Sequence, residues 1–210
     1  SAITGYMKKM VQVRAEFELQ QRSLAVILKS KGEANRIWEQ TLDLAVKSPF
    51  TIQELHGYVK ELSAYRIETE ALFDTTKRLA DVSAGLGVDM SRLILAYGQV
   101  RAAEYLRGTE LRQFTEAGIP LLQELADRFT ALEGRAVSTA EVFSRISKRM
   151  VTFQDVAAVF RSMTDEGGTF YRMQEEQSQT LAGQLSNFKD EMSIMLNDIG
   201  KETQGVIVMF

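Results

Sequence analysis

The stretch AYGQVRAAEYLRGTELRQFTEAGIPLLQEL, residues 96–125, decides the fold that we expect. Its apolar residues recur at the three- and four-residue spacing of helices, and Gly118-Ile119-Pro120 interrupts them. Gly118 is suited to end one helix in a left-handed conformation, and Pro120 is suited to the first position of the next. Ile119 precedes a proline, which favours extended backbone, and we expect its side chain to fill the core at the corner. The stretch therefore predicts a tight helix–helix corner and not an active site.

The same helical period continues on both sides of this corner, and strand patterns are nearly absent. The first segment has heptad spacing, with its apolar seam at Ile3, Tyr6, Met10, Val13, Phe17, Gln20, Leu24 and Ile27. Gly32 is expected to end this helix, and a second helix is expected from Glu33 to Lys47. A last long helix is expected from about Tyr171 to Ile199, with its seam at Leu181, Leu185, Phe188, Met192, Met195 and Ile199.

These patterns predict an all-α fold, in which a compact bundle of short helices is flanked by long heptad-patterned N- and C-terminal helices. We expect an N-terminal region at 1–47, a compact core at 48–170 and a C-terminal helix at 171–210. Helix starts are indicated by capping boxes at Thr51 with Glu54 and at Ser138 with Glu141. Thr152 with Asp155 is a weaker version of the same pattern. Glycine-bearing turns separate the short helices.

Composition excludes several classes of function. The chain of 210 residues is 45% hydrophobic, so a buried core is within reach, and its net charge is −3. That charge provides no general attraction for nucleic acid. The basic residues are also interleaved with acids, as at Arg101, Arg107, Arg112, Lys148 and Arg149, so we expect no nucleic-acid binding. The chain has no cysteine, which excludes disulfides, thiolate metal sites and cysteine nucleophiles.

The ends of the chain favour a piece cut from a longer protein, because no initiator methionine is present and the chain stops on the apolar GVIVMF at 205–210. The sequence has no run of eighteen apolar residues, so it predicts no membrane-spanning helix. We expect no membrane contact from the rest of the domain, and we leave such contact open for this apolar C-terminal end.

Candidate catalytic groups are few. His56 is the one histidine, and we expect a surface or hydrogen-bonded side chain with no metal or catalytic role. Adjacent carboxylates on a helix point about 100° apart, so Glu175-Glu176, Asp165-Glu166 and Asp190-Glu191 are interpreted as solvated faces. Gly85-Leu86-Gly87 and Gly167-Gly168 lack the preceding strand and the following Gly-Lys-Ser/Thr of a phosphate loop. We therefore predict no catalytic residue, no cofactor and no metal.

The order of the segments resembles the conserved domain of phage tail tape measure proteins. The resemblance rests on an L-x-x-A-x-G-Q-V-like run from Leu93 to Val100, a G-x-E-L-R-Q-like turn from Gly108 to Gln113 and the E-A-G-I-P break from Glu116 to Pro120. It closes with TLAGQLSNFKD from Thr180 to Asp190, and it extends over about Ser48 to Ile199. The motif residues that we single out are Gly108, Glu116, Ala117, Gly118, Ile119, Pro120, Gly183, Gln184 and Leu185.

The resemblance implies a structural, non-enzymatic role. The parent chain is expected to set tail length, to template the tail tube and to leave the tube during DNA ejection. The partners that it implies are the tail tube protein, tail assembly chaperones and baseplate or tail tip proteins. The sequence leaves two alternatives open for the heptad helices, since Ile3 to Ile27 can fold back on Leu181 to Ile199 or pair with another copy of the chain. The expected location is the phage tail lumen, after assembly in the bacterial cytoplasm.

Two other functions stay open from the sequence. One is a muralytic domain of a tail protein, since some tape measure proteins carry cell-wall-cleaving domains; such a site would need a carboxylate pair held across a cleft, and the sequence singles out no such pair. The loss of peptidoglycan turbidity on adding the domain would reveal it. The other is a freestanding helical interaction module, which an open reading frame continuing far beyond Phe210 would exclude.

Overall fold

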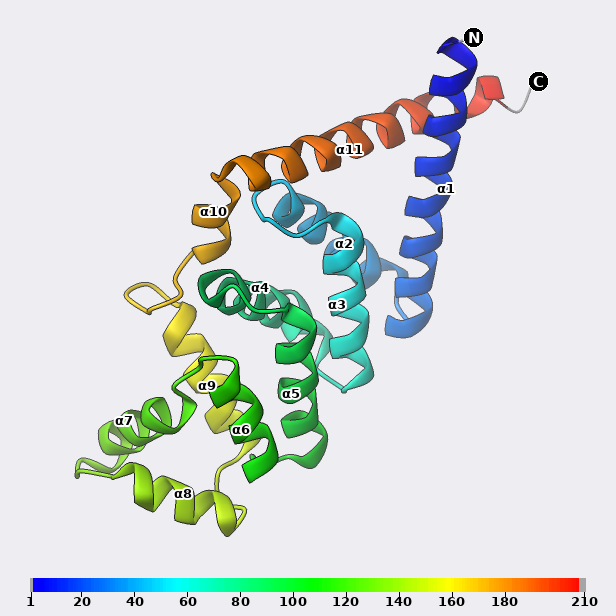
Figure 1. The fold of residues 1–210 in the computed structure, drawn as a ribbon. Helices are drawn as coiled ribbons and strands as arrows, with labels where there is room; N and C mark the ends of the chain where they lie inside the picture. The colour runs from blue at the N-terminus through cyan, green and yellow to red at the C-terminus, as the bar shows by residue number, and fades with distance from the viewer. Residues whose placement is uncertain (1, 208–210) are drawn as a thin grey trace. The chain divides into compact units, whose positions relative to one another are not determined.

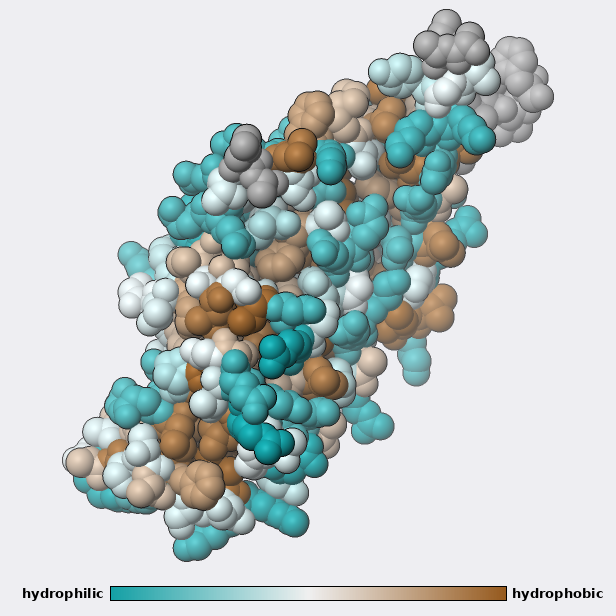
Figure 2. All heavy atoms as spheres, viewed as in Figure 1, coloured by the Kyte–Doolittle hydropathy of each residue, from teal (hydrophilic) through white to brown (hydrophobic). Residues whose placement is uncertain are grey.

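The computed structural model describes residues 2–207, and over this range the chain forms eleven helices and no strand (Figure 1). The predicted all-α class is confirmed. The chain divides into two compact units, the first formed by Ser1–Lys60 with Gln177–Phe210 and the second by Glu61–Glu176. The second unit is thus a continuous segment inserted into the first. One face of the molecule mixes hydrophilic residues with smaller hydrophobic patches (Figure 2).

The first unit contains α1 (Ala2–Leu28), α2 (Lys31–Ala45), most of α3 (Ile52–Ala64) and α11 (Leu181–Ile207). Its core is an aromatic stack in which the Phe17 ring meets the Trp38 ring edge-on at 5.1 Å, and the His56 ring stacks on the same Trp38 ring at 4.1 Å. These three side chains come from α1, α2 and α3, so one stack holds three helices together.

The two long helices of this unit contact each other. The Arg14 guanidinium of α1 donates a hydrogen bond to the Asn197 side-chain oxygen of α11 at 3.2 Å. Gly200 faces α1, since a Cβ atom there would lie in ordinary van der Waals contact, 3.4 Å from Met10 and 3.5 Å from Arg14. The terminal helices therefore pack within one chain, which the sequence alone left open.

The second unit contains α4 (Thr69–Leu86), α5 (Met90–Ala103), α6 (Gly108–Glu116), α7 (Leu121–Glu133), α8 (Thr139–Ser147) and α9 (Phe153–Thr164). The short α10 (Met173–Ser178) begins in it. Its core contains four aromatic rings, with Tyr97 at 5.2 Å from Phe153 and 5.3 Å from Phe160, which in turn lies 5.5 Å from Phe114. Aromatic contacts at these distances stabilise the packing of α5, α6 and α9 beyond the burial of their area.

The capping boxes form as the sequence predicts, with one difference. The Thr51 hydroxyl accepts from the Glu54 N–H at 3.2 Å and the Glu54 carboxylate accepts from the Thr51 N–H at 2.8 Å. Thr152 and Asp155 form a complete box as well. At Ser138 the hydroxyl accepts from the Glu141 N–H, whereas the Glu141 carboxylate binds Arg135 and Arg145.

Two of the predicted helix boundaries are wrong. Gly32 does not end the first helix but lies inside α2, and the break falls at Lys29, whose φ is +53°, before Ser30 caps α2. The long helix expected from Tyr171 to Ile199 is interrupted between α10 and α11. There the Thr180 hydroxyl accepts a hydrogen bond from the Gly183 N–H at 3.2 Å. A threonine that caps a new helix start in this way competes with continuation of the preceding helix, which explains the interruption.

Candidate functional site

The Gly118 corner is built from backbone hydrogen bonds. α6 ends at Glu116, Ala117 is its C-cap, and Gly118 adopts a φ of +89°. The Gly118 N–H donates to the Thr115 carbonyl and the Ile119 N–H donates to the Phe114 carbonyl, both at 2.9 Å. This pair of bonds is a Schellman motif, which satisfies carbonyls that the helix end would leave unpaired.

The two residues after the glycine direct the chain into α7. Ile119 is 1% exposed, so its side chain lies in the core as the sequence suggests. Pro120 is the N-cap of α7 and Leu121 is the first helical residue, one position later than the sequence predicts. The Pro120 carbonyl accepts from both the Gln123 and the Glu124 N–H groups at 3.0 Å. The corner is thus a packing device that joins α6 to α7.

Substitution of Gly118 by alanine should destabilise the chain by about 1–2 kcal/mol, because a side chain disfavours the positive φ that this position requires. A steric clash is not the cause, since the atom nearest to an added Cβ would be a Leu86 methyl carbon at 3.5 Å. Gly118→Asn should recover part of the loss, because asparagine tolerates this backbone region. Urea denaturation of the three proteins measures this, and equal losses for alanine and asparagine would contradict the explanation.

The other singled-out residues lie elsewhere. Gly108 is the first residue of α6, where an added Cβ would meet open space. Gly183 lies in the first turn of α11, where an added Cβ would come within 2.6 Å of the Ser178 backbone, so glycine is needed for the close turn between α10 and α11. Gln184 donates to the Gln179 carbonyl at 3.2 Å, and Leu185 is exposed. The motif residues therefore fall at three places along the chain, which are the start of α6, the Gly118 corner and the start of α11.

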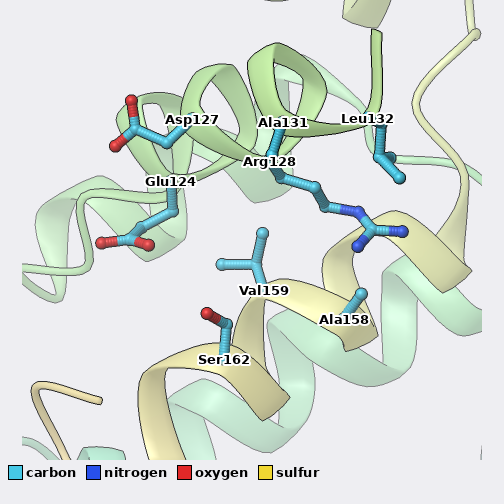
Figure 3. Close-up of a pocket in the computed structure, with 8 residues that line it drawn as sticks. All are labelled: Glu124, Asp127, Arg128, Ala131, Leu132, Ala158, Val159 and Ser162. Carbon is cyan, nitrogen blue, oxygen red and sulfur yellow. The ribbon is translucent and has the colours of Figure 1, made fainter. Parts of the chain in front are cut away.

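A pocket of about 350 Å³ lies between α7 and α9 (Figure 3). Val159 and the small side chains Ala131 and Ala158 line it. The Glu124 and Asp127 carboxylates lie together at one end, and the Arg128 guanidinium and Leu132 lie toward the other. Burial, together with the negative charge of Asp127, raises the pKa of the Glu124 carboxyl. Both carboxylates come from α7, so this pocket does not present a carboxylate pair from opposite walls, as glycoside hydrolysis requires.

One member of each carboxylate pair noted in the sequence has a structural partner. Asp165 accepts from the Arg78 guanidinium at 2.6 Å, and Glu175 pairs with Arg172. Asp190 is 4% exposed, and burial raises the pKa of its carboxyl to about 6 against the lowering effect of a hydrogen bond from the Ile52 N–H. The prediction of solvated faces is therefore wrong for Asp190, which lies against the start of α3. Nothing in its local sequence signals this, because Ile52 is far away along the chain.

His56 is not at the surface. Its side chain is 0% exposed, and neither ring nitrogen has a hydrogen-bond partner within the described residues. Burial, with a smaller contribution from the Lys60 ammonium, lowers the pKa of His56 to about 3. The prediction of a surface or hydrogen-bonded histidine is therefore wrong. His56 is instead a buried neutral ring that stacks on Trp38. A base with so low a pKa is poorly matched to proton transfer near neutral pH.

Among residues 2–207 no group of three or more His, Asp or Glu side chains is arranged to hold a metal ion. Within the same described range no helix is long and apolar enough to cross a membrane. Of the apolar segment 205–210, residues 208–210 lie outside the described part, and residues 205–207 are described only as the end of α11.

Comparison with known protein families gives one match, to the family described as tape measure protein, over residues 8–201. The match reaches further toward the N-terminus than the resemblance from Ser48 to Ile199 and includes most of α1. No curated protein and no solved structure matches the chain. Because the match extends over nearly the whole sequence, this chain belongs to the tape measure protein family and is a component of a phage tail.

Proposed function

We propose that this domain is a folded module on a tape measure chain that sets tail length and templates the polymerisation of tail tube subunits. The observation that supports the proposal is the family match over residues 8–201. The proposal is also consistent with the position of the two longest helices, since α1 and α11, of 27 residues each, lie at the two ends of the described chain. A helix extends by about 1.5 Å per residue, so chain length converts directly into distance along a tube. This role is mechanical and needs no catalytic group.

The proposed partners follow from the same role. The tape lies in the tail lumen, so the tail tube protein is its neighbour along the rod. The compact domain contacts assembly chaperones in the bacterial cytoplasm and baseplate or tail tip proteins in the finished particle. During DNA ejection the chain leaves the tube ahead of the genome.

An insertion of seventy heptad-patterned residues directly after Glu202 should lengthen the tails by about 105 Å, at about 1.5 Å per helical residue. This position follows the Gly200 contact with α1, so the packing of the first unit is kept. Electron microscopy of tails from a phage whose tape gene encodes the altered chain gives the length directly.

The matched control places the same seventy residues after Arg135, in the exposed turn between α7 and α8. Such an insertion lengthens the polypeptide but leaves the path of α11 unchanged, and we expect tails of normal length. Intact tails of unchanged length with the insertion after Glu202 would mean that this helix is no part of the ruler. Equal lengthening by both insertions would mean that the number of residues, and not the helical path, sets the length.

A further inference from the structure

The C-terminal helix α11 is packed with its polar side inward. Its buried residues include Asp190, Asn197 and Gly200, of which Asp190 contacts the α3 start while Asn197 and Gly200 contact α1. Much of the heptad seam predicted from the sequence faces outward instead, although Met192 is half-buried. Four of its members, each between 43% and 60% exposed, are Leu185, Phe188, Met195 and Ile199. This is the reverse of an ordinary amphipathic surface helix, whose apolar stripe faces the core.

The outward seam borders a groove of about 470 Å³. Val46, which follows the end of α2, lines one side, and Ile194, Met195 and Ile199 of α11 line the other. Single exposed apolar residues are common on proteins, but a lined groove beside a regular apolar seam is typical of a surface that binds a helix. The 3-4 spacing of the seam fits another helix of the same period.

The charge around the groove indicates what kind of helix fits it. Its lining also includes the three carboxylates Glu191, Asp198 and Glu202. Asp198 is neutralised by Lys201 at 3.2 Å, whereas no ion pair joins Glu191 or Glu202 to any cation in residues 2–207. An apolar groove bordered by uncompensated carboxylates is complementary to apolar side chains flanked by lysine or arginine.

A second copy of α11 fits the groove less well. The next seam position after Ile199 is Glu202, so two copies paired in register would place two carboxylates against each other in the interface. We infer that the α11 groove binds a basic amphipathic helix of a partner protein. This inference concerns the folded chain alone, so it stands or falls independently of the proposed role in tail length.

The test uses the full chain and two synthetic 21-residue helices with the same heptad apolar seam. One peptide carries lysine at the positions that flank its seam, and the other carries glutamate. We expect the chain to bind the lysine peptide at least fivefold more tightly at about 0.15 M salt, as measured by fluorescence anisotropy. The double variant Glu191→Lys/Glu202→Lys should reverse this preference. The double variant Met195→Gln/Ile199→Gln should lose binding of the lysine peptide.

The charge-matched control is Glu39→Lys/Glu70→Lys, which changes net charge equally at exposed positions outside the groove and should keep the preference. Circular dichroism and the fluorescence of Trp38 establish that each variant is folded. Equal binding of the two peptides, or loss of the preference in the control, would overturn the inference. Dimerisation of the chain in sedimentation, abolished by Met195→Gln/Ile199→Gln, would also overturn it, because a second copy would then occupy the groove.

Discussion

Replacement of Gly98 by alanine should destabilise the protein by about 2 kcal/mol or more, although alanine is ordinarily the better helix former by about 1 kcal/mol. Gly98 lies on α5, and the Tyr65 ring packs directly on its backbone. An added Cβ would lie 2.1 Å from the Tyr65 Cδ2 and 2.4 Å from its Cγ. The Cγ atom lies on the axis about which the ring turns, so a turn of the ring about its Cβ–Cγ bond does not relieve the clash.

Two comparisons separate this clash from other effects of the substitution. Gly57→Ala changes a helical glycine in α3 that has open space around it, and it should stabilise the protein by about 0.5–1 kcal/mol. In a Tyr65→Ala background, Gly98→Ala should become neutral or stabilising, because the clashing ring is gone. Urea denaturation of the four variants measures all terms of this cycle. A Gly98→Ala loss that persists without the Tyr65 ring would show that the contact is not its cause.

His56→Leu should change how the first unit responds to acid. With a folded pKa of about 3 against an ordinary value of 6.5, His56 contributes full stability above pH 6.5, and this is lost as the pH falls toward 3. At pH 5 the loss from this residue amounts to about 2 kcal/mol. Relative to the wild type, the leucine variant should therefore gain about 2 kcal/mol of unfolding free energy between pH 7.5 and pH 5.

The comparison with the His56→Leu variant is needed because Asp190 changes the stability in the opposite direction when the pH falls. Its pKa of about 6 in the folded chain is above the ordinary 3.8, so acidification between these values relieves the cost of a buried charge. The wild type alone therefore shows a flattened pH dependence. Trp38 is the one tryptophan of the chain and stacks on His56, so its fluorescence reports unfolding of this unit. A difference between the two proteins that stays constant from pH 7.5 to pH 5 would contradict a neutral buried histidine.

Features determined by neighbouring residues were predictable from the sequence. A glycine before an X-Pro pair favours a corner through the backbone preferences of those residues alone. The capping residues Thr51 and Thr152 act over three positions, and both helix starts form where the pattern places them. The helical class follows in the same way, since apolar periodicity is a local signal.

Features that depend on distant partners were not predictable. His56 is buried because Trp38, on another helix, covers its ring. The sequence predicts a heptad seam on α11, but periodicity does not tell which face of the helix the rest of the chain covers. Here the polar side of α11 faces inward, since Asp190 and Asn197 find an N–H group and a guanidinium. The groove itself joins Val46 to residues about 150 positions later in the sequence.

The order of the units along the chain has a mechanical consequence. The second unit is inserted within the first, and α1 contacts α11. Tension applied to the two ends of the domain is therefore borne first by the α1–α11 contact, and the inserted unit is shielded until that contact opens. That contact includes the Arg14–Asn197 hydrogen bond and the packing of Gly200 against α1. A chain pulled by its two ends would thus extend in two steps, with its terminal helices separating before the inserted unit bears any load.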